Sequence, residues 1–139
     1  MKVLIDTNII LDYLLEREPF VEQADELVEL LVENRISACV AAHTITNLFY
    51  ILKKNMPLDK MRDVLQNLCG EFEIVGVDSA KIVSVLRNCT FQDLEDCLQD
   101  ECAADFNAEY IITRNTKDFR SSKVKAVTPE EFLYLFRMQ

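Results

Sequence analysis

The chain has 139 residues, 24 of them acidic and 15 basic, so its formal charge at pH 7 is −9. This acidity disfavours a protein that simply coats nucleic acid, because such proteins are basic. It is compatible with an enzyme whose carboxylates bind divalent cations. The length predicts a single domain, residues 1–139. No stretch approaches the ~20 apolar residues of a membrane span, and the N-terminus lacks a signal-peptide pattern. We therefore expect a cytoplasmic protein without a membrane segment.

Cysteine and histidine usage argues against a disulfide framework or a zinc site. The number of cysteines is odd, and no two of them form a Cys-x-x-Cys pair. The single histidine, His43, has no metal-ligand partners near it in the sequence, so we expect it to be structural or superficial. The five cysteines are Cys39, Cys69, Cys89, Cys97 and Cys102.

The first thirteen residues join a buried strand to a helix. Residues 3–5 form an apolar run without alternation, which is typical of a central strand in a parallel sheet. The run ends in Asp6-Thr7-Asn8, and apolar residues then recur at helical spacing. A carboxylate therefore stands at the carboxyl end of a central strand, where ligands bind in open α/β sheets. The alternative is that Asp6, Thr7 or Asn8 only caps the helix.

The rest of the chain alternates strands and helices. Further apolar runs predict strands at residues 36–40, 72–77, 110–113 and 124–127. Between them, apolar residues at helical spacing predict helices, of which the one opened by Pro57 is expected to end with Gly70 as its C′ residue. This order predicts an α/β fold, a three-layer sandwich in which helices flank a central parallel sheet. The other helices begin near Phe20, Ala42, Asp78, Asp93 and Thr128.

The helix predicted from Asp93 carries acids on one face. Asp93, Asp96 and Asp100 lie at i, i+3 and i+7, away from the apolar stripe. Like charges at this spacing repel one another in an isolated helix. Capping explains Asp93, and the helix dipole favours an acid at Asp96. Asp100 is two turns into the helix and gains little from the dipole, so local helix chemistry explains this face only in part.

A polar loop, residues 113–119, follows the strand predicted at 110–113. It places Asn115 and Asp118 at the carboxyl end of that strand, unless it is only an Asx-type turn. We expect Asp6, Asp96 and Asp118 to meet at one edge of the sheet. Carboxylates without histidine or cysteine suit hard cations such as Mg²⁺ or Mn²⁺. Phosphodiester hydrolysis is the natural chemistry of such a site.

These three stretches resemble the motifs of PIN domains. Residues 1–8 are similar to the first strand of that family, which ends in Asp-Thr-Asn, and residues 93–96 and 113–119 are similar to its later acidic motifs. The resemblance covers nearly the whole chain and points to the group that includes VapC-type toxins. It implies a Mg²⁺- or Mn²⁺-dependent endoribonuclease, the toxin of a toxin–antitoxin pair, with RNA as substrate and an antitoxin protein as partner. It also implies a homodimer. We expect exposed apolar residues on the helix from Phe20 or on the helix from Pro57 to supply the dimer surface.

The resemblance assigns roles to individual residues. Three carboxylates are the catalytic residues and metal ligands: Asp6, Asp96 and Asp118. Two amides join them as metal ligands, Asn47 and Asn115. Four residues are expected to support the site: Thr7, Asn8, Thr113 and Glu95. Three basic residues are candidates for contacts with substrate phosphates: Arg114, Lys117 and Arg120.

Two positions depart from the family pattern. The family usually has Glu where this chain has Asn47, and Thr-x-Asp where this chain has Asn115 as the third residue. An amide oxygen binds metal or water but brings no charge. Glu95 and Asp100 are candidates to replace the missing charges. The departures also support a second hypothesis, a catalytically weakened PIN-like RNA-binding or interaction module. A third, a phosphatase or receiver-like domain, requires an aspartyl nucleophile with a matching Lys, and the sequence has no such motif.

Overall fold

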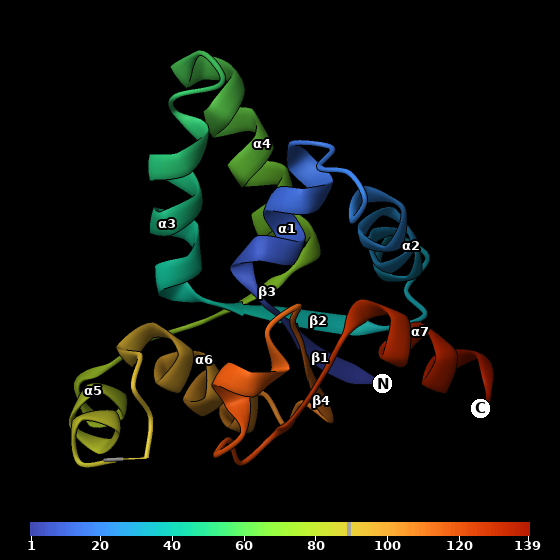
Figure 1. Ribbon diagram of the computed structural model, residues 1–139. Helices are drawn as coiled ribbons and strands as arrows, with labels where there is room; N and C mark the ends of the chain where they lie inside the picture. Colours follow the sequence, from blue (N-terminus) through green and yellow to red (C-terminus); the bar gives the residue numbers. More distant parts are fainter. Residues whose placement is uncertain (89) are drawn as a thin grey trace.

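The computed structural model describes residues 1–88 and 90–139, which contain a five-stranded parallel sheet with the strand order β3-β2-β1-β4-β5 (Figure 1). Cys89 lies outside the described residues. The central strand β1 is flanked by β2 and β4, which is why its apolar residues are buried on both faces as predicted. The strands are β1 (Lys2–Ile5), β2 (Ser37–Ala41), β3 (Glu73–Val75), β4 (Tyr110–Ile112) and β5 (Lys125–Val127).

Helices cover both faces of the sheet, so the predicted three-layer α/β sandwich is confirmed. One layer contains α1 (Thr7–Leu14), α2 (Val21–Val32), α3 (Ala42–Leu52), α4 (Leu58–Glu71) and α7 (Pro129–Arg137). The other contains α6 (Leu94–Asp105), with α5 (Ser79–Leu86) packed beside it, as Figure 1 shows below the sheet. A short 3₁₀ helix, η1 (Thr116–Phe119), follows β4. No helix in the described ranges is long and apolar enough to cross a membrane.

Alternate residues of the central strand serve the two layers. Val3 and Ile5 pack into the core beneath α1, α2 and α7, while Leu4 packs with Cys39 and Ile111 in the core against α6. Each such side chain contributes roughly 1.5–3 kcal/mol by leaving water. The two cores together fix the sheet, and with it the edge at which the strands end.

Local sequence signals set most helix ends. Thr128 and Glu131 form a capping box, because each side chain accepts a hydrogen bond from the other's backbone N–H at 3.1 Å. The prediction for Gly70 is wrong, since α4 continues through it to Glu71. Phe72, which is buried, then turns the chain directly into extended backbone toward β3, so no left-handed residue is needed there.

Candidate active site

Asp6 is the first residue after the central strand, at the N-terminal end of α1. Its side chain makes no capping bond to that helix, so the capping hypothesis fails for Asp6. Instead its Oδ1 accepts a hydrogen bond from Gln99 Nε2 at 3.1 Å, and its Oδ2 accepts one from Thr113 Oγ1 at 2.8 Å. The residue is only 7% exposed. Both carboxylate oxygens are therefore held in place by neighbours from α6 and from the end of β4.

Thr113 links the end of β4 to the loop that follows it. Its hydroxyl donates to Asp6 and accepts a hydrogen bond from the backbone N–H of Asn115 at 3.1 Å. The chain then enters η1, which presents Asp118 and is anchored by the buried ring of Phe119. One hydroxyl thus ties the first acidic motif of the sequence to the last.

A hollow of about 370 Å³ opens at this carboxyl edge, and we call it the carboxylate pocket. Asp6, Asp96 and Asp118 all line it, although they come from three separate segments. The three carboxylates thus share one hollow, and their role as a single metal site stays a prediction. The lining also includes predicted residues Thr7, Asn8, Asn47, Glu95 and Asn115, together with Leu11, Tyr50, Ile51, Asp93 and Gln99.

Asp96 carries the strongest electrostatic signature in the pocket. Burial raises its pKa to about 7, and the charges of Asp93, Asp6, Asp118 and Glu95 push in the same direction. The helix dipole, which favours an acid in the first turn of α6, is outweighed. Asp93 has the ordinary role, because its Oδ1 accepts a hydrogen bond from the backbone N–H of Asp96 at 2.9 Å as an N-cap. Negative charge is therefore concentrated here, and no Lys or Arg is among the described residues that line the pocket.

Asn47 and Glu95 meet across the pocket from different helices. Asn47 Nδ2 on α3 donates to Glu95 Oε2 on α6 at 3.1 Å. A carboxylate therefore lies beside the position where the family usually has its Glu. The hypothesis that Asp100 replaces a missing charge is wrong. Asp100 is buried and accepts hydrogen bonds from the backbone N–H groups of Lys123 and Val124 at 3.0 and 3.1 Å. Asp100 fixes the approach to β5 and does not line the pocket.

Arg114 is engaged elsewhere, by a residue that the sequence analysis did not single out. Its guanidinium contacts the fully buried carboxylate of Asp12 on α1, with Nε 3.0 Å from Oδ2 and a hydrogen bond from Nη2 to Oδ1 at 3.3 Å. Its other face stacks on Phe20 at 4.0 Å from the ring centroid, and Arg17 adds a longer ion pair to Asp12 at 3.6 Å. In the sequence Asp12 reads as an ordinary polar residue of a helix. The only sign of its burial is that apolar residues surround it. These contacts argue against Arg114 as a phosphate ligand.

Lys117 and Arg120 lie beside the site rather than in it. They line a second hollow of about 400 Å³ that adjoins the carboxylate pocket, together with Phe91 and Ser121. Arg120 Nε also donates to the backbone oxygen of Lys117 at 3.2 Å, which stiffens the turn. We call this hollow the cationic pocket.

The donors in the carboxylate pocket suit a hydrated divalent ion. Carboxylate and amide oxygens are the ligands that Mg²⁺ and Mn²⁺ prefer. Gln99 Oε1 is buried without a hydrogen-bond partner. Leaving a buried acceptor unpaired costs about 1–3 kcal/mol of folding free energy, which a ligand that pairs with this oxygen would recover. Within residues 1–88 and 90–139, no group of three Asp, Glu, His or Cys side chains is placed so that it could hold a metal ion by itself. An ion in this pocket would therefore need ligands beyond these side chains, and Mg²⁺ usually keeps several waters when it binds to protein.

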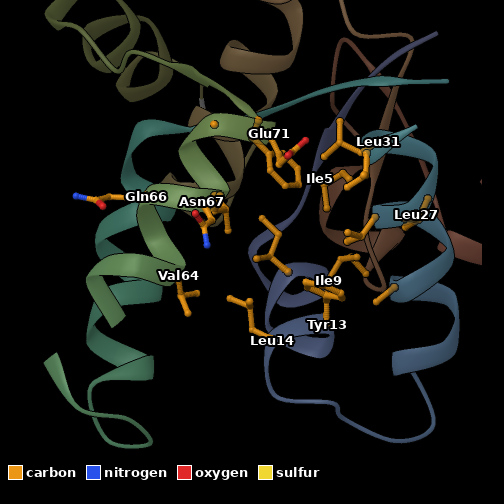
Figure 2. A pocket seen from close by; sticks show the side chains of 17 residues that line it. Ile5, Ile9, Tyr13, Leu14, Leu27, Leu31, Val64, Gln66, Asn67 and Glu71 are labelled. Atoms are coloured by element: carbon orange, nitrogen blue, oxygen red, sulfur yellow. The ribbon is translucent and has the colours of Figure 1, made fainter. Parts of the chain in front are cut away.

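A third hollow, of about 640 Å³, lies between α2 and α4 above α1. Figure 2 shows Ile9, Tyr13 and Leu14 of α1 at its base, Leu27 and Leu31 on the α2 side, and Val64 and Asn67 on the α4 side. Its lining is mostly aliphatic, and part of it is exposed, with Tyr13 at 38% and Val32 at 55%. We call it the apolar groove. It shares no lining residue with the carboxylate pocket.

Known proteins are similar to this chain in sequence or in fold. Ribonuclease VapC1 from Aquifex aeolicus is 27% identical over 137 residues, covering 94% of this chain and 92% of that protein. VapBC2 from Rickettsia felis, solved with a DNA fragment from its promoter, matches at a TM-score of 0.67 and 17% identity, over 92% of this chain and 98% of that chain. A toxin–antitoxin complex from Klebsiella pneumoniae matches at 0.67 and 24%, over 91% and 97%.

A family model of the PIN domain matches residues 2–117, which include the first two acidic motifs and the third as far as Lys117, one residue before Asp118. The resemblance drawn from the sequence is confirmed, and this chain belongs to the PIN domain family.

Proposed function

We propose that this protein is a metal-dependent endoribonuclease of the cytoplasm, built as a single PIN domain over residues 1–139 and acting as the toxin of a toxin–antitoxin pair. The observation that carries the proposal is the meeting of Asp6, Asp96 and Asp118 around one pocket whose negative charge the protein does not neutralise. The name of the curated relative, a ribonuclease, supports RNA as the substrate.

Mg²⁺ or Mn²⁺, when bound, would supply Lewis-acid chemistry by lowering the pKa of a bound water and by neutralising charge on the scissile phosphate. Asp6 would be the anchoring ligand, because its two oxygens are already oriented by Gln99 and Thr113. Asp96 and Asp118 would complete the charged set and position the attacking water. Asn47 and Asn115 add neutral oxygen donors, while Thr7 and Asn8 shape the pocket wall.

Glu95 supplies the negative charge that is missing at the position of Asn47. The charge that the family usually places on the α3 side comes here from α6, and Asn47 orients it through their hydrogen bond. This arrangement favours an active enzyme over the alternative of a weakened RNA-binding or interaction module.

Incubation of the protein with RNA and Mn²⁺ or Mg²⁺ tests the proposal. We expect cleavage in both metals, and none with EDTA or with Asp6→Asn. Glu95→Gln keeps the contact with Asn47 but removes the charge, and it should be slower at limiting metal. RNA that is bound but never cleaved would support the interaction module instead.

The apolar groove supports an antitoxin partner. It is a long aliphatic trough between two helices, a shape that receives one face of an amphipathic helix. Two of the similar solved structures are a VapBC assembly and a toxin–antitoxin complex. We therefore propose that the antitoxin, a small protein encoded by the adjoining gene, inserts an apolar segment into this groove.

Val28→Arg tests that placement, since Val28 lines the groove. We expect it to weaken binding of the neighbouring gene product in calorimetry by more than tenfold, because it buries a charge without a partner. Ile82→Arg, on the exposed face of α5, is the matched control. Equal affinity for the two variants would place the antitoxin elsewhere.

The homodimer remains a prediction. The helices named for it, α2 and α4, are also the walls of the apolar groove, so an antitoxin and a second copy would compete for that surface. Sedimentation at micromolar protein should reveal a species of twice 16.1 kDa. A dimer that persists in Val28→Arg would show that the copies meet outside the groove, and a monomer in the wild type would contradict the prediction.

A further inference from the structure

The carboxylate pocket and the cationic pocket adjoin each other. Asp93, Asp96 and Asp118 line both, and we call these three residues the carboxylate ridge. The walls beyond the ridge differ. The carboxylate pocket extends from the ridge to Tyr50 and Ile51 of α3, whereas the cationic pocket extends from it to Lys117 and Arg120, in and after η1. A ligand that reaches the ridge therefore has two chemically distinct surfaces beside it.

Tyr50 is an aromatic residue whose ring remains largely exposed to solvent. It is 62% exposed although it lines the carboxylate pocket. The rings of Tyr50 and Phe49 are perpendicular, with the centroids 6.1 Å apart and the planes 89° apart, and Lys53 Nζ lies over the Tyr50 ring at 4.9 Å from its centroid. Lys53 thus takes one face of the ring, and the opposite face of such an exposed ring is the kind of platform on which a nucleobase stacks.

Lys117 and Arg120 supply positive charge in the cationic pocket. Neither makes an ion pair with another described residue. The chain as a whole is strongly acidic, so it has little general attraction for RNA. Two uncommitted cations in a pocket next to the ridge are therefore suited to bind phosphates locally.

We propose that a single RNA strand crosses the carboxylate ridge, with one base stacked on Tyr50 and the neighbouring backbone phosphates bound by Lys117 and Arg120. The inference deepens the proposed nuclease function and rests on it. A single strand is required, because a base can stack on a protein ring only when it is freed from a duplex. Tyr50 thereby becomes a positioning residue that sets which bond lies over the ridge.

Fluorescence anisotropy tests the proposal with a labelled single-stranded RNA of mixed sequence in Ca²⁺, with a gel to check that the RNA stays intact. We expect Tyr50→Ala to raise both the Kd and the KM about tenfold with a smaller change in kcat, and Tyr50→Phe to retain most of the affinity. Lys117→Ala and Arg120→Ala should each lower the slope of log Kd against log salt by about 1. A fully paired RNA should bind more weakly than the single strand.

Matched controls separate these effects from general surface changes. Tyr134→Ala removes a tyrosine that is 61% exposed on α7, and Lys125→Ala removes an exposed lysine on β5, where neither residue touches the ridge. If Tyr50→Ala and Lys117→Ala behave like these controls while the wild type cleaves RNA, the subsite is wrong and the nuclease function stands. If the wild type binds but never cleaves, and both variants bind more weakly, the subsite stands and the nuclease function fails. If the wild type does neither, both fail.

Discussion

Asp12 and the carboxylate pocket handle buried negative charge in opposite ways. Asp12 is completely buried, and burial raises its pKa, but Arg114 and Arg17 contact it and Phe20 covers the guanidinium of Arg114. In the carboxylate pocket, Asp96 is crowded by other acids and makes no ion pair with a described arginine or lysine. Both regions lie around α1 and the loop after β4.

The buried charge of Asp12 serves the fold, whereas the charges of the carboxylate pocket are suited to binding a ligand. At Asp12 the fold has supplied its own cations, and the result is a clamp that holds the loop of residues 113–118 against α1. In the carboxylate pocket the compensation is left to something from outside the chain. Repulsion within a cluster of like charges lowers the stability of the fold, and such clusters are typical of sites where a bound ligand offsets that repulsion. Four substitutions test this contrast.

Asp6→Asn should have the largest effect, on the uncompensated side. It removes the charge of the best-oriented ligand while keeping a side chain that Thr113 can still contact. We expect the rate of RNA cleavage to fall by at least about a hundredfold and Mn²⁺ binding in calorimetry to be lost. Thermal unfolding of the metal-free variant should be unchanged or slightly higher. Retention of cleavage at the wild-type rate would remove Asp6 from the active site.

Asp12→Ala should have the largest effect on the compensated side. It leaves the Arg114 guanidinium largely buried without its partner, so the free energy of unfolding should fall by about 3 kcal/mol in urea denaturation. Glu33→Ala, which removes an exposed partner of Arg35, should cost less than about 1 kcal/mol. A similar loss in both variants would mean that the clamp is no stronger than a surface ion pair.

Asp96→Asn should change how the metal-free protein responds to pH. Because the pKa of Asp96 is raised to about 7, the folded state binds more protons than the unfolded state between about pH 4 and 7, and stability falls as the pH rises through that window. The substitution should remove this slope and, after allowance for solvent screening, stabilise the protein at pH 8 by on the order of 2 kcal/mol in EDTA. Asp59→Asn, an acid in the first turn of α4, is the control. Parallel pH profiles for wild type and Asp96→Asn would contradict the prediction.

Asn47→Glu should have the smallest effect and should act in both directions. The new carboxylate would face Glu95, so the metal-free protein should be slightly less stable. With metal, the added charge should tighten Mn²⁺ binding several-fold, on the order of 1 kcal/mol, and raise cleavage at limiting metal. Asn55→Glu, just beyond the end of α3, is the control. Unchanged affinity, in an assay where Asp6→Asn abolishes binding, would place Asn47 outside the metal shell.

Short-range patterns were sufficient for the architecture. The apolar run at residues 3–5 predicted the central strand, and the capping box at Thr128 predicted the start of α7, because burial and capping depend on a few adjacent residues. Gly70 misled the prediction, since a glycine signals a helix end only when the backbone must turn left-handed.

The sequence by itself also determined that three acidic segments end at one edge of a parallel sheet, because strand direction and crossover handedness leave them no other place. Only the tertiary structure decided how each acid is used. Three aspartates on two helices show the difference. Asp12 pairs with two arginines, Asp96 lies among other acids, and Asp100 accepts hydrogen bonds from two backbone N–H groups. Asp93 and Glu95 are close to Asp96 in the chain and Arg17 lies five residues from Asp12, but the other partners lie more than twenty residues away. The free energy of each carboxylate is therefore set largely by packing between elements rather than by its own neighbours in the chain.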